Sequence, residues 1–170
     1  MSPITRPIKI TTTQSAPTDG ALTDASFTDA EHILRHCRTV AVVGLSPKPE
    51  RDSFRVAHYM QSQGWRIVPV NPMVTEPILG EPVFANLLLA AQHVRIELVN
   101  CFRQADEIPA IVADALAVQA QALWMQKGIE HPAAAASARA GGLKVVQNQC
   151  LMVEYARWRG LPDPHLDAHR

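Results

Sequence analysis

Five short apolar runs alternate with amphipathic segments along this chain, and that alternation restricts the fold more than any other feature. Runs such as Ala41–Val43 lack alternating polar residues, which is typical of parallel strands covered by helices on both faces. The segments between the runs are long enough for helices that connect such strands by right-handed crossovers. The pattern predicts a single α/β domain with a Rossmann-like open parallel five-stranded sheet and helices on both faces, for which we expect the strand order 3-2-1-4-5. The predicted strands are 39–43, 66–70, 94–99, 121–125 and 143–147, and the predicted helices between them are 53–63, 85–91, 105–119 and 131–140.

The folded part is expected to begin at residue 28. Thr28 and Glu31 have the spacing of a capping box, which predicts a short helix that leads into the first strand. Residues 1–27 are rich in Thr, Ser, Pro and Gln and lack apolar periodicity, so we expect a flexible N-terminal arm there. We expect the domain to span 28–157 and a C-terminal tail to span 158–170. The end of the chain carries an aromatic and basic stretch at 155–159, which is expected to pack either on the core or on a second subunit.

Composition argues against several classes of partner. Of the 170 residues, 47% are hydrophobic, which supports a folded core, and 16 basic and 16 acidic residues give a formal net charge of zero. A neutral chain has no general field for nucleic acid or an anionic membrane, and no apolar run approaches the roughly 20 residues that span a bilayer. Three widely spaced cysteines fit neither a disulfide framework nor a zinc site, and the N-terminus lacks a signal-peptide pattern. We therefore expect a soluble cytoplasmic protein.

The segment after the first predicted strand has the composition of a phosphate-binding loop. Gly44, Ser46 and Lys48 follow the strand, and Arg51 and Ser53 lie where the next helix begins. The free N–H groups and the dipole of a helix N-terminus favour an anion. A single glycine excludes both the G-x-G-x-x-G dinucleotide fingerprint and the P-loop, which need further glycines. We predict a phosphate site here, with Ser53 serving either as a ligand contact or as a helix N-cap.

Other candidate contacts lie at the carboxyl ends of the predicted strands, where open α/β sheets bind ligands. Asn71 follows the second strand and either contacts a ligand or holds a turn through its side chain. Arg103 follows the third strand near a helix start, where its charge opposes the helix dipole, and that placement favours a functional role. Basic residues outnumber acidic ones in these loops, so we expect an anionic ligand. The loops considered are 44–51, 70–72, 100–103, 125–128 and 148–150.

Evidence for catalysis is limited. No pair of carboxylates occupies these loops, no G-x-S-x-G motif is present, and the histidines have no metal-binding spacing. Cys101 and Cys150 lie at predicted strand ends, where a thiol either meets a ligand or packs as a small apolar residue. The sequence therefore favours a binding protein over an enzyme and assigns no catalytic or metal-ligating residue.

Several segments occur together in one order along the chain: Val42–Pro49 with Arg51 and Ser53, Pro69–Pro72, Phe102–Arg103, Trp124–Gln126 with Gly128 and Ile129, and the segment around Cys150. In these segments the chain resembles the small bacterial CoA-binding domain proteins, which are similar to the nucleotide-binding half of the succinyl-CoA synthetase alpha subunit. The resemblance covers about residues 28–157. It implies a Rossmann-like domain that binds coenzyme A and lacks the second half that gives the synthetase its activity.

The resemblance also implies which residues would contact coenzyme A. One departure limits the transfer of roles, because many relatives read Asp-Arg-Cys-Pro where this chain reads Asn148-Gln149-Cys150-Leu151 and so lacks both charges. The implied contacts are Gly44, Leu45, Ser46 and Lys48 with the phosphates, Val70, Asn71 and Pro72 with the adenosine side, Arg103 with another edge of the cleft, and Met125, Gln126 and Gly128 with the pantetheine arm.

Three functional hypotheses follow. The first is a protein that binds coenzyme A or an acyl-CoA and has no complete catalytic apparatus of its own. The second is an enzyme, either an NAD(P)-dependent oxidoreductase or a thiol-dependent CoA-transferring enzyme that uses Cys150 or Cys101. Asn71 stands where NAD enzymes carry an acidic residue for the ribose, which argues against NAD. The third is a regulatory module that reports CoA status to a protein partner, and a homodimer is possible in each case.

Overall fold

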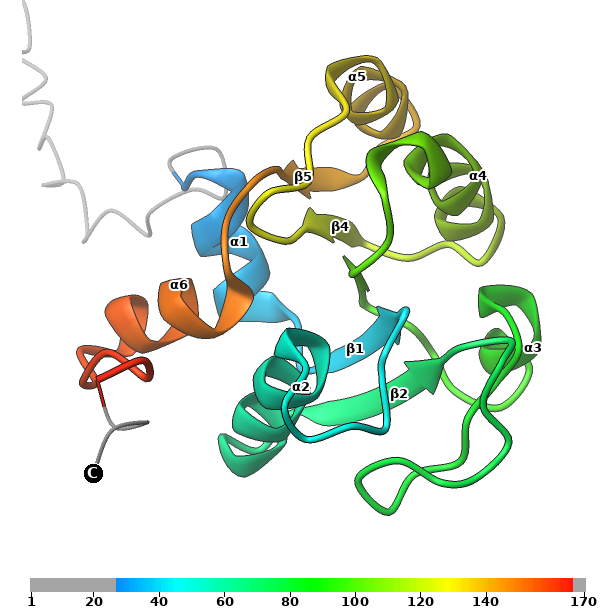
Figure 1. Cartoon of the computed structure of the whole chain (residues 1–170). Helices are drawn as coiled ribbons and strands as arrows, with labels where there is room; N and C mark the ends of the chain where they lie inside the picture. The colour runs from blue at the N-terminus through cyan, green and yellow to red at the C-terminus, as the bar shows by residue number, and fades with distance from the viewer. Residues whose placement is uncertain (1–26, 167–170) are drawn as a thin grey trace, which may run out of the picture.

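The computed structural model describes residues 27–166, so the arm predicted at 1–27 lies outside the described residues except for Phe27. A parallel sheet forms the centre, with helices on both of its faces (Figure 1). The predicted capping box is confirmed, because the Glu31 N–H donates to Thr28 Oγ1 and the Thr28 N–H donates to Glu31 Oε2 at 3.0 Å. The elements are α1 Asp29–His36, β1 Thr39–Val43, α2 Asp52–Ser62, β2 Arg66–Val70, α3 Leu87–Ala91, β3 Leu98–Cys101, the 3-10 helix η2 Ala105–Glu107, α4 Ile108–Ala117, β4 Ala122–Met125, α5 Pro132–Ala140, β5 Lys144–Val146 and α6 Leu151–Arg159.

The sheet has the order β2-β1-β3-β4-β5, and every neighbouring pair is parallel. The predicted five-stranded parallel sheet is therefore confirmed, but the predicted order 3-2-1-4-5 is wrong. The physical reason lies at the outer edge of β2, where Pro69 has no N–H for a further strand and its carbonyl accepts a hydrogen bond from the Phe84 N–H at 3.0 Å. The chain consequently crosses back and places β3 beside β1, which puts the reversal of strand order between β1 and β3.

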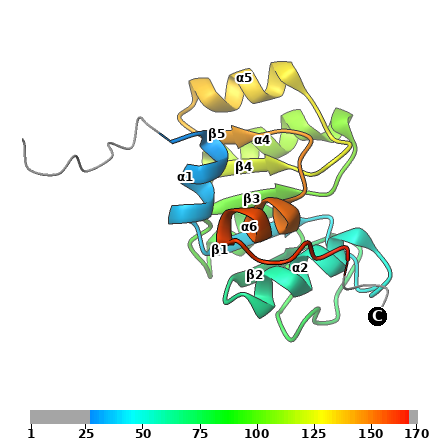
Figure 2. The same ribbon diagram turned by 90° about the vertical axis from the view of Figure 1, so that its left-hand side faces the viewer.

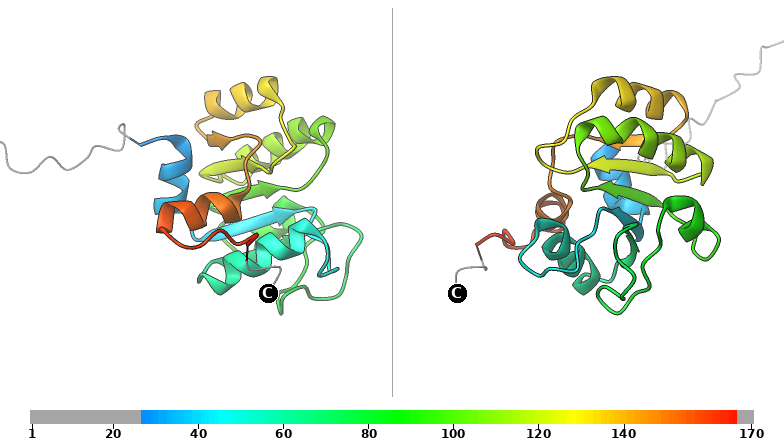
Figure 3. Two further views of the ribbon diagram at one scale, coloured as in Figure 1. Left: turned by 60° about the vertical axis from the view of Figure 1, so that its left-hand side comes forward. Right: turned by 45° about the vertical axis from the view of Figure 1, so that its right-hand side comes forward.

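Two apolar cores cover the two faces of the sheet. One contains buried residues of α1, α2 and α6, and the other contains buried residues of α3, α4 and α5. The helices α1, α2 and α6 lie in front of the sheet in Figure 2 and in the left view of Figure 3. The right view of Figure 3 brings forward the side that carries α3, α4 and α5. Trp124 of β4 is fully buried in the first core, where its Nε1–H donates to the Gln149 carbonyl at 2.7 Å. This arrangement leaves the loops at the carboxyl ends of the strands uncovered.

The third strand differs from its prediction at both ends. β3 spans Leu98–Cys101 instead of 94–99, because the Val94 N–H donates to the Ala90 carbonyl and so belongs to the turn that ends α3. Glu97 also lies before the strand, and its carboxylate accepts hydrogen bonds from two backbone N–H groups at the start of β1. Asn100 and Cys101 are therefore strand residues and do not belong to the loop where the sequence analysis placed them.

The final helix packs on the core, which settles the two alternatives offered for the stretch at 155–159. Tyr155 is 1% exposed, and its ring meets Trp65 edge-on with centroids 5.8 Å apart. The helix α6 continues across residue 157 to Arg159, and Gly160 ends it in a left-handed conformation with φ of +66°. Within residues 27–166 no helix combines the length and apolar character needed to cross a membrane.

Candidate functional site

Gly44 joins the loops that follow β1 and β3. Its φ is +88°, and a Cβ at this position would lie 2.7 Å from the Phe102 carbonyl oxygen and 2.8 Å from Arg103 Cδ. The Gly44 N–H donates to the Val70 carbonyl at 2.9 Å, so the loop is also tied to the end of β2. Glycine is required here for two separate reasons, its left-handed backbone and the close approach of the β3 loop.

Ser53 holds the loop between β1 and α2, predicted above to bind phosphate, in shape. Its hydroxyl accepts a hydrogen bond from the Ser46 N–H at 3.0 Å, and the Ser46 hydroxyl accepts one from the Lys48 N–H at 3.2 Å. Ser53 is the second residue of α2 and is 6% exposed, so it does not serve as the N-cap that the sequence analysis considered. The N-cap is Arg51, whose side chain makes no capping hydrogen bond. The first N–H groups of α2 therefore have no side-chain cap to compete with an anion.

The charges at this loop suit an anionic ligand. Lys48 and Arg51 are exposed, and neither takes part in an ion pair within residues 27–166. The nearby carboxylate of Asp52 is paired with Arg55, three residues further along the helix. A cavity of about 450 Å³ lies between these groups, and it is lined by Gly44, Ser46, Lys48, Arg51, Asp52, Ser53 and Phe102.

Asn71 connects the loops that follow β1 and β2. Its side-chain N–H donates to the Leu45 carbonyl at 3.0 Å, and its Oδ1 accepts from the Met73 N–H at 2.9 Å. Of the two roles expected for Asn71, the hydrogen bonds show that of holding a turn. Beside it lies a second cavity of about 420 Å³, which is lined by Val43, Gly44, Val70, Pro72, Ala85, Asn86, Leu87, Arg103, Asp106, Glu107, Ala110, Ile111 and Asp114.

The second cavity carries acidic groups that the sequence analysis missed. Asp106, Glu107 and Asp114 all line it, although the loops were expected to be predominantly basic. The Arg103 guanidinium donates to Glu107 Oε1 at 2.6 Å, and this hydrogen bond holds the pKa of the Glu107 carboxyl below its ordinary value. Arg103 is thus partly neutralised by its neighbour. Asp106 lies in η2, shortly after β3 in the sequence, whereas Asp114 comes from the interior of α4 and reaches the cavity only through the tertiary fold.

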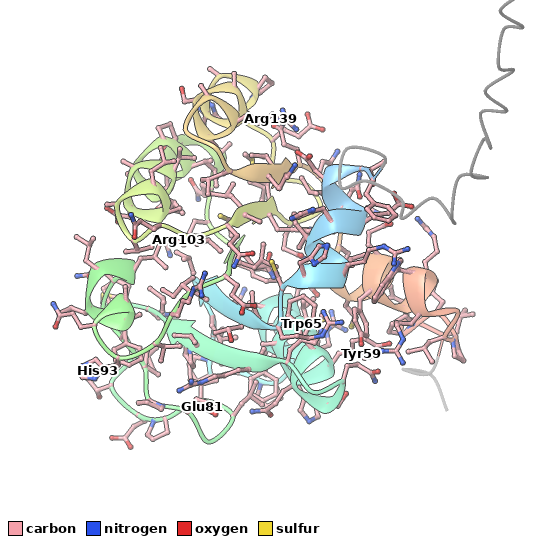
Figure 4. The ribbon with its side chains drawn as sticks, turned by 180° about the vertical axis from the view of Figure 1, so that it is seen from behind. Tyr59, Trp65, Glu81, His93, Arg103 and Arg139 are labelled. Carbon is pink, nitrogen blue, oxygen red and sulfur yellow. The ribbon has the colours of Figure 1, made fainter. Side chains whose placement is uncertain are left out.

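A third and larger cavity of about 540 Å³ lies on the other side of Arg103. Its walls come from the start of α2, the loops after β3 and β4, the start of α6 and the C-terminal segment. Arg103, which lines both this cavity and the second one, is labelled in Figure 4. Cys150, the N-cap of α6, is partly exposed and faces this cavity. The lining is Asp52, Arg55, Val56, Phe102, Arg103, Gln104, Ala105, Gln126, Lys127, Gly128, Ile129, Cys150, Met152 and His165.

The other two cysteines are inaccessible. Cys101 is fully buried in β3, and burial raises the pKa of its thiol to about 12. Cys37 is also buried, and the pKa of its thiol is likewise raised to about 12, chiefly by burial. Of the two roles expected for Cys101, its complete burial at the last position of β3 shows that of a small apolar residue.

Gln126 and Gly128 line the third cavity, and hydrogen bonds to neighbouring segments hold both residues in place. Gln126 is 5% exposed, and its side-chain oxygen accepts from the Leu151 N–H at 2.9 Å, which caps the start of α6. Gly128 has φ of +87°, and its N–H donates to Asn148 Oδ1 at 2.7 Å. Asn148 in turn donates from its amide to Glu130 Oε1 at 2.8 Å. Asn148 thus has a structural role that the sequence analysis did not anticipate, and its left-handed φ of +54° is one that asparagine tolerates.

The structure separates the predicted contact residues into two groups. Leu45, Val70 and Met125 are at most 3% exposed, so their side chains offer almost no surface to a ligand, although Val70 belongs to the lining of the second cavity. The remaining predicted residues lie along the cavities or hold their loops. Side chains that the site prediction did not include also line the cavities, among them Arg55, Phe102, Asp106, Asp114, Lys127, Cys150, Met152 and His165.

The three cavities adjoin one another at the carboxyl edge of the sheet, since each pair shares at least one lining residue, and together they are called the groove below. The first and second share Gly44, the first and third share Asp52 and Phe102, and the second and third share Arg103. A further cavity of about 290 Å³ lies at the outer edge of β2, beside Glu81 and His93, and shares none of these residues (Figure 4). The cavity at the loop between β1 and α2 shares lining residues with both of the other two cavities.

Comparison with known proteins gives consistent matches. A family model described as "CoA binding domain" matches residues 38–156. "Uncharacterized protein YneT" from Bacillus subtilis (strain 168) is 31% identical over 131 residues, which cover 77% of this chain and 95% of that protein. A crystal structure described as "Prb (PH1109 protein redesigned for binding)" has a TM-score of 0.74 and 34% identity over 82% of this chain and 97% of its own. A hypothetical protein from Pyrococcus horikoshii OT3 has a TM-score of 0.71 and 31% identity over 82% of this chain and 98% of its own.

Proposed function

The chain belongs to the CoA binding domain family, and on that premise we propose that it binds coenzyme A or an acyl-CoA thioester as a binding domain without a complete catalytic apparatus. The observation that carries the proposal is that the cavity at the loop between β1 and α2 shares lining residues with two further cavities, which together offer room for three parts of one ligand. Coenzyme A has the same order of parts, because a diphosphate joins an adenosine to a pantetheine arm.

The diphosphate is assigned to the loop between β1 and α2. Uncapped N–H groups at the start of α2 and the unpaired charges of Lys48 and Arg51 supply donors and positive potential for it. Ser46, held by Ser53, fixes the direction of the loop. Binding should therefore weaken as salt is added, since these two charges are exposed and screened by ions.

The adenosine is assigned to the cavity beside Pro72 and Asn86. This cavity combines apolar walls with the carboxylates of Asp106 and Asp114, which accept hydrogen bonds from hydroxyl or amino groups. The pantetheine arm is assigned to the cavity on the other side of Arg103, beside Gly128 and Cys150. Phe102, Val56 and Met152 give that cavity apolar surface for the methylene and methyl groups of the arm.

The enzyme alternatives have weaker support. Burial and the raised pKa of Cys101 leave Cys150 as the thiol that a transfer reaction would have to use. An oxidoreductase would need an acidic side chain at the end of β2, where Asn71 instead donates to the Leu45 carbonyl. The regulatory-module hypothesis stays a prediction, and a pull-down in which the captured proteins change with added CoA would support it.

Titration calorimetry with coenzyme A, dephospho-CoA and NAD tests the proposed function. We expect saturable heat with coenzyme A and none with NAD at the same concentration, because the loop lacks the dinucleotide fingerprint. Dephospho-CoA measures the contribution of the 3′-phosphate. The absence of both heat and a thermal shift with coenzyme A and with acyl-CoA thioesters at millimolar concentration would contradict the proposal.

A further inference from the structure

The C-terminal segment Gly160–Leu166 folds back to the third cavity, although it lies beyond the residues 38–156 that the family model matches. Gly160 reverses the chain with its left-handed backbone, and the Leu161 N–H donates to the Ala156 carbonyl at 2.8 Å. Figure 2 shows the segment returning alongside α6. This segment therefore contributes His165 to the lining of a cavity that is otherwise built by the matched part.

Local interactions fix the shape of the returning segment. Pro162 and Pro164 each restrict the backbone, and Asp163 bonds to the residues that follow it. The His165 N–H donates to Asp163 Oδ1 at 2.9 Å, and the Leu166 N–H donates to the Asp163 carbonyl at 3.0 Å. These bonds form a compact turn that presents His165 at the cavity.

His165 lies at the cavity assigned to the arm and at neither of the other two. It lines the cavity that contains Cys150 and Met152, whereas the linings of the phosphate-loop cavity and the adenosine cavity do not include it. Arg55, which α2 contributes to that lining, is already paired with Asp52. The imidazole ring can donate one hydrogen bond and accept another, and the pantetheine arm carries amide groups that need such partners.

We propose that His165 is a specificity-determining contact for the arm of the ligand, and that its imidazole N–H donates a hydrogen bond to a carbonyl oxygen of that arm. This inference rests on the proposed function, because it takes the third cavity as the place of the arm. The segment around His165 then narrows the third cavity, compared with the same cavity built from residues 38–156 alone.

The test compares coenzyme A with adenosine 3′,5′-bisphosphate, which lacks the arm, by calorimetry on the full chain. The variants are His165→Ala, His165→Gln, which keeps a side-chain N–H donor, and the control His58→Ala, which removes an exposed histidine of α2 outside the cavity lining. We expect His165→Ala to weaken coenzyme A binding by about 3- to 10-fold, the range for one lost hydrogen bond. Binding of the bisphosphate should stay the same, His165→Gln should recover part of the loss, and His58→Ala should bind like the parent.

The outcomes separate this inference from the proposed function. If the parent binds neither compound, the proposed function fails and the inference fails with it. If the parent binds coenzyme A and His165→Ala binds it equally well, the proposed function stands and the inference is wrong. Tighter binding by His165→Ala would show that the segment obstructs the cavity, and an equal loss for both compounds would show an indirect structural effect; either result overturns the inference.

Discussion

Replacing Gly44 with alanine should disrupt the junction between the loops that follow β1 and β3. The added Cβ would lie 2.7 Å from the carbonyl oxygen of Phe102, a backbone atom that cannot rotate away, and φ is +88°. A left-handed conformation costs a residue with a Cβ about 1–2 kcal/mol, and overpacking costs about 1–3 kcal/mol more. We therefore expect Gly44→Ala to lower the free energy of unfolding by about 2–5 kcal/mol and to weaken coenzyme A binding.

Gly64→Ala is the matched control for this substitution. Gly64 has nearly the same backbone, with φ of +89°, but no atom lies within 4 Å of the Cβ position. Only the conformational cost of about 1–2 kcal/mol applies to it. Urea unfolding of both variants, followed by circular dichroism, measures the difference, and equal losses of stability would refute the argument that contact with the β3 loop requires glycine at position 44.

Three further substitutions test separate parts of the structure. Lys48→Ala should weaken coenzyme A binding by about 1–3 kcal/mol with little change in stability. The control Lys144→Ala, at the start of β5 and outside the groove, should leave the binding affinity unchanged. Equal affinity of Lys48→Ala and the parent by calorimetry would remove Lys48 from the site. On incubation with CoA disulfide, the Cys150 thiolate should displace one CoA thiolate and form a mixed disulfide. Intact-mass spectrometry should detect this adduct in the parent and not in Cys150→Ser. An unmodified chain, or an adduct at Cys37 alone, would contradict the prediction. Asn100→Val should raise the free energy of unfolding by about 1–2 kcal/mol, because the buried Asn100 amide has no hydrogen-bond partner within the described residues, and a lower melting temperature would contradict it.

The sheet was predictable from the sequence because uninterrupted apolar runs identify buried parallel strands. Four of the five strands fall where the runs predict them, whereas β3 begins later because Val94 is taken by the end of α3. The strand order depended on Pro69, whose missing N–H marks β2 as an edge strand. That signal was present in the sequence, and it argues against a further strand on the outer side of β2.

The candidate site was only partly predictable, for a physical reason. The phosphate loop is local, since Gly44, Ser46 and Lys48 follow one strand and precede one helix, so its pattern is legible in a short segment. The acidic wall with Asp114 depends on how α4 packs, and the position of His165 depends on the reversal at Gly160. Such contacts join residues far apart in the chain, and no local pattern specifies them.

Chemical-shift mapping by NMR tests the single-groove account most directly, because it reports each part of the site in one titration. Addition of coenzyme A to the ¹⁵N-labelled chain should shift the backbone amides of Gly44, Arg103 and Gly128, which line the three connected cavities. The amides of Glu81 and His93, at the separate cavity on the edge of β2, should stay in place. Shifts confined to Glu81 and His93, or no shifts at saturating coenzyme A, would contradict the account.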